Sequence, residues 1–237
     1  MTKIVLLLSG LMLLALTSCT EKAEKPKVIY DSSKKAAVVP QVDTTQIEIA
    51  DLPILISGTN YLIHPIGDVR VFKGSKGYVN SSSAGVSYTI SNYSEFEITG
   101  YLRNFKFQQI DSDSISALTD KRVLIQSATC VIPSFDRNKQ VMIYSLADMD
   151  TNKDGKLDDN DIKTLYISTV SGQRFTKLSV DYEEVIDWKF IENKGRIYFR
   201  TIEDTNKNGE FDKDDVVHYN YADLNNDEWK VTSYKPV

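Results

Sequence analysis

Residues 196–221 read RIYFRTIEDTNKNGEFDKDDVVHYNY, and this stretch decides the fold that the sequence predicts. Two runs rich in Ile, Tyr, Phe, Thr and Val, residues 196–202 and 216–221, flank a loop of Asp, Asn and Gly. Branched and aromatic residues favour strands, whereas Gly, Asn and Asp favour turns. We therefore expect two antiparallel strands joined by a loop at residues 204–215.

The same pattern occurs earlier in the chain, at an offset of 204 − 150 = 54 residues. Ile-Tyr followed by DTNKDG, ending at Gly155, matches Ile-Tyr followed by DTNKNG, ending at Gly209. A repeat of this length, built from four short strands, has the size of a β-propeller blade. In the second copy the strands are expected at residues 185–191, 196–202, 216–222 and 229–234.

Short strand-like runs continue through residues 47–237, and no long helical periodicity appears. We expect an all-β domain of short antiparallel strands with a small or incomplete β-propeller-like architecture. A β-sandwich with two related hairpins is the alternative. Residues 132–136 (IPSFD) ahead of residues 141–145 (VMIYS) resemble the blade pattern of TolB-type propellers, with Asp136-Arg137-Asn138 in place of that family's Pro-Asp-Gly turn.

Both loops carry the ligand spacing of a calcium site. Oxygen-bearing side chains occupy positions 1, 3, 5, 9 and 12, glycine occupies position 6, and position 7 offers a backbone carbonyl. Calcium takes six to eight oxygen ligands, and the glycine permits the sharp turn that points them inward. The predicted ligands are Asp150, Asn152, Asp154, Lys156, Asp158 and Asp161 in loop one, and Asp204, Asn206, Asn208, Glu210, Asp212 and Asp215 in loop two.

Loop one (residues 150–161) and loop two (residues 204–215) resemble EF-hand and dockerin loops in this ligand pattern, with Asp instead of Glu at position 12. Their flanks are strand-like, so we expect two Ca²⁺ ions at the tips of β-hairpins, in a structural role. Loop one has four acidic ligand side chains and loop two has three, which favours tighter binding in loop one. The alternative is that these residues only form turns.

The N-terminus predicts a secreted and lipid-anchored protein. Residues 1–18 have one charge, Lys3, followed by an apolar run, which is typical of a signal peptide. Leu16-Thr17-Ser18-Cys19 resembles the lipobox of bacterial lipoproteins, and the resemblance implies lipid on Cys19. Residues 19–46 are polar and are expected to form a lipidated, flexible tether. Thr20 after the cysteine favours the outer membrane, on its periplasmic or surface face.

Composition argues against other classes of function. The chain has a formal charge of −5, and without the signal peptide it has 27 basic and 33 acidic residues, which disfavours nucleic acid as a partner. Neither histidine, His64 or His218, belongs to a known catalytic or metal-binding motif. Cys130 is expected to be a small buried residue. We expect no enzyme, and the alternative is a carboxylate-based glycoside hydrolase.

The expected function is therefore that of a lipid-anchored envelope protein with structural calcium, acting as a binding component of an envelope or surface complex. The alternative is a surface lipoprotein that binds or degrades glycans. The expected partners are the membrane, through the lipid anchor, and an envelope protein or a glycan.

Overall fold

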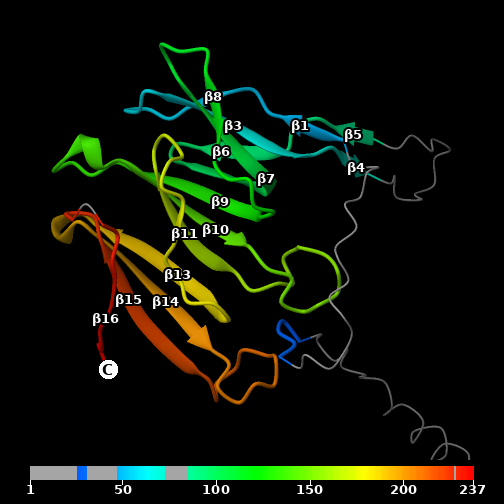
Figure 1. Cartoon of the computed structure of the whole chain (residues 1–237), viewed down its shortest axis with the longest axis vertical. Coiled ribbons are helices and arrows are strands. Elements are labelled where there is room, and N and C mark those ends of the chain that lie inside the picture. Colours follow the sequence, from blue (N-terminus) through cyan, green and yellow to red (C-terminus); the bar gives the residue numbers. More distant parts are fainter. Residues whose placement is uncertain (1–25, 31–46, 73–84, 227) are drawn as a thin grey trace, which may run out of the picture.

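The structure is a computed structural model, and it describes residues 26–30, 47–72, 85–226 and 228–237 (Figure 1). All strand pairings among these residues are antiparallel. The helical segments found in them are two short 3₁₀ turns, Arg137–Lys139 and Glu192–Lys194. The expectation of an all-β, antiparallel domain is thus confirmed.

The strands form a ten-stranded sheet, a four-stranded sheet and a separate hairpin. The ten-stranded sheet contains β1 (Glu48–Ala50), β2 (Ile54–Leu55), β3 (Tyr61–Asp68), β6 (Ser91–Ser94), β7 (Glu97–Gln109), β8 (Ile115–Ala117), β9 (Leu124–Val131), β10 (Val141–Ala147), β11 (Thr164–Thr169) and β12 (Thr176–Lys177). The four-stranded sheet contains β13 (Glu183–Ile191), β14 (Arg196–Glu203), β15 (Val216–Asp223) and β16 (Val231–Ser233), and the hairpin contains β4 (Arg70–Phe72) and β5 (Gly85–Ser87).

Strand β7 connects two layers of the larger sheet. Its first residues pair with β6 and β9, and its later residues pair with β3 and β8. The pairing with β9 shifts register between Thr99 and Leu102, around Gly100. A β-carbon at Gly100 would lie 2.8 Å from the Ile90 carbonyl oxygen, so the close approach requires glycine. Irregular pairing of this kind bends a strand, which takes β7 from one layer into the next.

Strand β10 lies in the middle layer and is buried on both faces. Val141 and Ile143 pack into a core shared with the four-stranded sheet. Met142 and Tyr144 point the other way, into the core formed with β3 and β7. Because successive side chains of a strand point to opposite faces, a strand in this place needs a nearly continuous apolar run, and residues 141–147 (VMIYSLA) provide it.

Strand β14 is buried on one face only, and its sequence alternates accordingly. Ile197 and Phe199 face the larger sheet and are fully buried, whereas Tyr198 on the opposite face is partly exposed. Alternation of apolar and polar residues is typical of a half-buried strand. The four strands predicted for the second repeat copy are all present, in the simple order β13-β14-β15-β16.

The repeat does not produce a propeller in the described part of the chain. The first copy also forms a four-stranded meander, β9-β10-β11-β12, but β9 pairs on its other side with β7. The first copy is therefore part of a larger sheet and not a separate blade. Among the described residues no sheet closes on itself, and the layers stack as the β3–β7 part, the β9–β12 part and the β13–β16 sheet (Figure 1).

The expected signal peptide and Cys19 lie outside the described residues. Within the residues that the structure describes, no helix is long and apolar enough to cross a membrane.

Candidate metal-binding sites

The two predicted calcium loops connect equivalent strands. Loop one joins β10 to β11, and loop two joins β14 to β15, so each lies at the tip of a hairpin. Both tips lie at the same end of the molecule, with residues 26–30 between them (Figure 1). The repeat has thus placed two acidic loops close to one another in space.

In loop one, the side chains at positions 1 and 3 converge on one backbone N–H. The Asp154 N–H lies 3.1 Å from Asp150 Oδ1 and 3.0 Å from Asn152 Oδ1. The Gly155 N–H donates to the other Asp150 oxygen, at 2.9 Å. Two oxygens that share one donor must lie on the same side of the loop, so positions 1 and 3 both point inward.

Loop two repeats this arrangement. The Asn208 N–H lies 3.2 Å from Asp204 Oδ1 and 2.8 Å from Asn206 Oδ1, and the Gly209 N–H donates to Asp204 Oδ2 at 2.7 Å. The N–H of position 7 bonds the side-chain oxygen of position 5 in both copies: Lys156 to Asp154 at 2.9 Å, and Glu210 to Asn208 at 2.8 Å.

The aspartate at position 12 closes each loop onto its own start. Asp161 accepts the N–H of Thr151 at 2.8 Å and the N–H of Asp158 at 3.0 Å. Asp215 accepts the N–H of Thr205 at 3.1 Å and that of Asp212 at 3.0 Å. Position 12 therefore ties the second and ninth positions of both loops together.

Positions 4 and 6 have left-handed backbone conformations in both loops. Lys153 and Lys207 at position 4 have φ values of 55° and 57°. Gly155 and Gly209 at position 6 have φ values of 85° and 88°. Non-glycine residues seldom adopt positive φ, so two copies that agree at both positions share one specific loop conformation and not merely a turn-forming composition.

The structure brings some predicted ligands together and keeps others apart. Within the described residues, no three acidic side chains of either loop have ligand oxygens within 4.8 Å of one another. Asp158 and Asp212 at position 9 bond the N–H groups of Asn160 and Asp214, two residues further on. Clustered carboxylates repel one another, which keeps the acidic side chains of each loop apart. Positions 1 and 3 thus point inward in both loops, whereas position 9 bonds its own turn.

Residues 26–30, which were expected to belong to the flexible tether, pack between the two loops instead. The N–H groups of Lys27 and Val28 donate to the Gly209 carbonyl, at 2.8 and 3.3 Å, and the Ile29 N–H donates to the Thr151 carbonyl at 2.9 Å. Val28 is only 2% exposed. Lys27 forms a 3.1 Å ion pair with Glu184. These five residues (PKVIY) of the predicted tether therefore contact the domain, and Val28, Ile29 and Tyr30 are buried or partly buried there.

Burial and charge affect two titratable groups beside the loops. Burial raises the pKa of the Asp161 carboxyl, and the backbone N–H groups of Asp158, Thr151 and Asn152 oppose that increase. Burial, followed by the charge of Asp204, raises the pKa of the Tyr30 phenol. In both groups burial is the largest cause, and a neighbouring carboxylate, Asp150 for Asp161 and Asp204 for Tyr30, adds to it.

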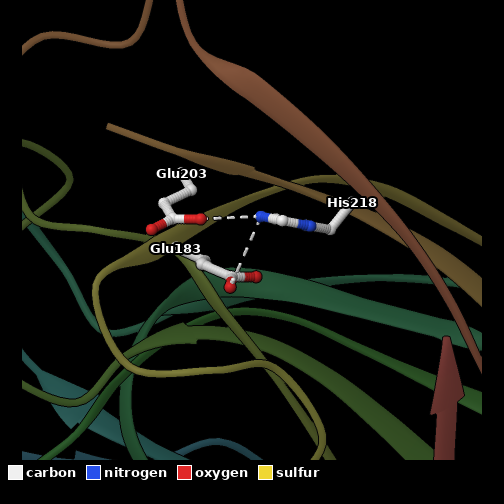
Figure 2. Close-up of side chains that lie close together, drawn as sticks. All are labelled: Glu183, Glu203 and His218. Carbon is white, nitrogen blue, oxygen red and sulfur yellow. Dashed lines mark hydrogen bonds and ion pairs between the residues drawn. The ribbon is translucent and has the colours of Figure 1, made fainter. Parts of the chain in front are cut away.

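Sequence reasoning missed one further group of metal-ligating side chains. Glu183 on β13, Glu203 on β14 and His218 on β15 each have a ligand atom within 4.8 Å of the other two (Figure 2). The expectation that His218 belongs to no constellation is thus corrected. Strand register explains the grouping, because Glu183 pairs with Glu203, and His218 pairs with Thr201, two residues before Glu203 on the same face.

His64 remains apart from any such group in the described chain, and its Nε2 lies 3.2 Å from Gln108 Oε1. Cys130 is 5% exposed, as expected for a buried thiol, and burial raises its pKa to about 12. A thiol with so high a pKa is a poor nucleophile and a poor metal ligand near neutral pH.

Comparison with known proteins gives no functional lead. No protein-family model matches the chain, and no curated protein matches it.

Proposed function

We propose that this protein is a lipid-anchored envelope protein whose all-β domain binds two Ca²⁺ ions, one in loop one and one in loop two, and acts by binding a partner in the envelope or at the cell surface. The observation that carries the calcium proposal is the agreement between the loops. Two segments 54 residues apart share inward-pointing oxygens at positions 1 and 3, a closing aspartate at position 12 and positive φ at positions 4 and 6.

The ligand chemistry supports Ca²⁺ in particular. Side-chain carboxylates, side-chain amides and one backbone carbonyl are hard oxygen ligands, and the loops contain neither histidine nor cysteine. Mg²⁺ requires a stricter octahedral geometry and retains several waters, so a flexible set of six oxygens suits Ca²⁺ better. Lys156 and Glu210 would contribute backbone carbonyls at position 7.

The contacts of residues 26–30 support a structural role for calcium. This segment forms hydrogen bonds to Thr151 in loop one and to Gly209 in loop two. An ion in each loop would keep these carbonyls in place and so hold the segment against the domain. We therefore propose that calcium also sets the distance between the membrane anchor and the folded domain, by shortening the free part of the tether.

Calcium titration of the full-length chain in detergent tests this proposal. Isothermal titration should show two sites, with Asp150→Asn removing the tighter one and Asp204→Asn the weaker one. At about tenfold excess of free calcium over the dissociation constant, each site adds roughly 1.4 kcal/mol to the free energy of unfolding. Chelation should then lower the melting temperature by about 6–11 °C, given about 2–4 °C per kcal/mol. No heat and no shift would refute calcium binding.

The lipid anchor is tested separately. Cys19→Ser should move the protein from the membrane fraction to the soluble fraction, while the calcium titration stays unchanged. Continued membrane association of this variant would show that the anchor proposal is wrong.

A glycan partner is the second candidate, and one feature favours it. A pocket of about 310 Å³ is lined by Trp229 together with polar side chains that include Asn138, Gln140 and Asn226. Aromatic and amide groups in one pocket suit sugar recognition. However, the guanidinium of Arg174 lies 4.2 Å from the centre of the Trp229 ring and covers one face of it.

A protein partner therefore remains the preferred proposal. The tyrosines on the outer face of the four-stranded sheet also favour this choice, because Tyr198, Tyr221 and Tyr234 pack at tilted or perpendicular angles of 41° to 87°. Rings at such angles to one another do not form one shared flat platform for a sugar ring.

A further inference from the structure

Glu183, Glu203 and His218 direct their polar atoms toward a common point (Figure 2). His218 Nε2 lies 2.9 Å from Glu203 Oε2 and 3.9 Å from Glu183 Oε1. The three side chains come from three adjacent strands, β13, β14 and β15, so rigid backbone pairing holds their starting points.

The group has more negative charge than its partners neutralise. The two carboxylates carry a charge of −2, and the imidazole contributes at most +1. Within the described residues, the ion-pair partner of both carboxylates is His218. The Glu183 side chain is only 12% exposed, so its charge is poorly screened by water. A small cation between the three groups would remove this excess.

Thr201 holds Glu183 in an orientation that suits a ligand. The Thr201 hydroxyl, which is fully buried, donates a hydrogen bond to Glu183 Oε2. The other oxygen, Oε1, is the one that faces His218. Hydrogen bonds from a second layer of residues commonly orient metal-ligating carboxylates in this way.

We propose that Glu183, Glu203 and His218 form a binding site for a divalent transition-metal ion, of which Zn²⁺ is the probe of choice. Bonds of about 2.0–2.1 Å from zinc to nitrogen or oxygen place the ligand atoms of a tetrahedral site roughly 3.4 Å apart. The 2.9 and 3.9 Å separations of this group lie on either side of that value. Three protein ligands leave a fourth position for water or an anion.

The imidazole nitrogen gives this site a ligand chemistry that the calcium loops lack. Histidine suits Zn²⁺ and neighbouring transition metals, whereas Ca²⁺ prefers oxygen. The site is also absent from the first repeat copy, where the offset of 54 residues leads to Thr129, Met149 and Thr164. The repeat fold forms without these ligands, so their presence in the second copy is an addition to the fold and not a requirement of it.

Zinc titration of the full-length chain in detergent, with calcium at a saturating level, tests this proposal. Wild type should bind one equivalent of Zn²⁺, and His218→Ala should weaken binding at least tenfold. Thr201→Val should weaken it about 10- to 100-fold, as expected for loss of a hydrogen bond to a ligand. His64→Ala is the matched control, because His64 is the chain's other histidine, and it should leave zinc binding unchanged.

The proposal is overturned if wild type takes up no zinc, or if His218→Ala binds zinc as wild type does. Glu203→Gln provides a second variant if His218→Ala does not fold, because the Glu203 side chain is half exposed and tolerates substitution. Unchanged zinc affinity in Glu203→Gln would also overturn the assignment. Visible absorption of Co²⁺-loaded protein gives a readout of the ligand set, and loss of His218 should alter that spectrum.

Discussion

Loop one and loop two share a backbone conformation but differ in what covers them. In loop one, Thr151, Asn152 and Asp161 are buried, and Leu157 packs against Leu124 and Ala147 of the larger sheet. In loop two, Thr205, Asn206 and Asn208 are exposed. Loop one is thus supported by the domain itself, whereas loop two has less support from the strands around it.

The cover of loop two comes largely from the N-terminal segment. Gly209 is buried, and a β-carbon there would lie 2.4 Å from the Val28 carbonyl oxygen and 2.7 Å from Pro26 Cβ. The segment therefore rests directly on the loop. The difference shows that repeated sequence produces the same local loop, while contacts with other parts of the chain decide how deeply each copy is buried.

The largest expected effect concerns how much the hydrogen bonds of loop one stabilise the protein in the absence of metal. In excess chelator, Asp161→Ala should lower the free energy of unfolding by about 2–3 kcal/mol, since it leaves the buried Thr151 N–H and the Asp158 N–H without their acceptor. Asp215→Ala removes the matching bonds from the less buried loop two and should cost about 1 kcal/mol. Urea denaturation of both variants measures the difference.

Asp161→Asn serves as the control, because its amide oxygen can still accept the Thr151 N–H. This variant should lie between wild type and Asp161→Ala in stability. Equal losses for Asp161→Ala and Asp215→Ala would mean that the two loops have the same support in the calcium-free protein, and the comparison drawn above would fail.

The local features of the fold were predictable from the sequence, and the distant contacts were not. Apolar residues alternate or cluster, as they do in strands, at residues 196–202 and 216–222. The structure has β14 and β15 at these places, within a residue or two of the expected bounds. Gly155 and Gly209 marked the turns correctly. These features depend on neighbouring residues, which a pattern can capture.

The larger arrangement depends on contacts between segments far apart in the chain. The register shift of β7 lies around Gly100, where the backbone approaches Ile90 closely, and nothing in the sequence near Gly100 identifies that neighbour. Composition predicted a tether at residues 19–46 because charged and small residues dominate that window. Averaging over the window concealed Val28, Ile29 and Tyr30, a short apolar run that packs onto loops more than a hundred residues away.

The grouping of His218 with Glu183 and Glu203 was hidden for the same reason. The sequence did contain one signal for this grouping. The length of the loop in a hairpin fixes which residues of its two strands pair. Pairing Glu203 with Val216 places His218 on the same face as Glu203, one step along the sheet. The third member of the group, Glu183, depends on the register of β13, which a bulge between Val185 and Asp187 alters and the sequence does not reveal.

A smaller effect separates the two threonines at position 2 of the loops. The Thr151 hydroxyl donates to the Lys27 carbonyl at 2.8 Å and accepts the Ile162 N–H at 3.0 Å. Thr205 is exposed, and its hydroxyl lies 3.5 Å from Asp215. Thr151→Ala should therefore cost about 1–1.5 kcal/mol, and Thr205→Ala no more than about 0.5 kcal/mol, in urea denaturation.

Limited proteolysis tests whether the loss of stability in Thr151→Ala comes from release of residues 26–30. If the Thr151 hydroxyl holds residues 26–30 in place, Thr151→Ala should speed trypsin cleavage after Lys27 several-fold under native conditions, while Thr205→Ala leaves the rate unchanged. Cleavage that depends on local release reports the stability of the segment rather than that of the whole domain. An unchanged rate in Thr151→Ala, despite a loss of global stability, would mean that the Thr151 hydroxyl does not hold the segment, and that its backbone hydrogen bonds, the Lys27–Glu184 ion pair and the burial of Val28 do so.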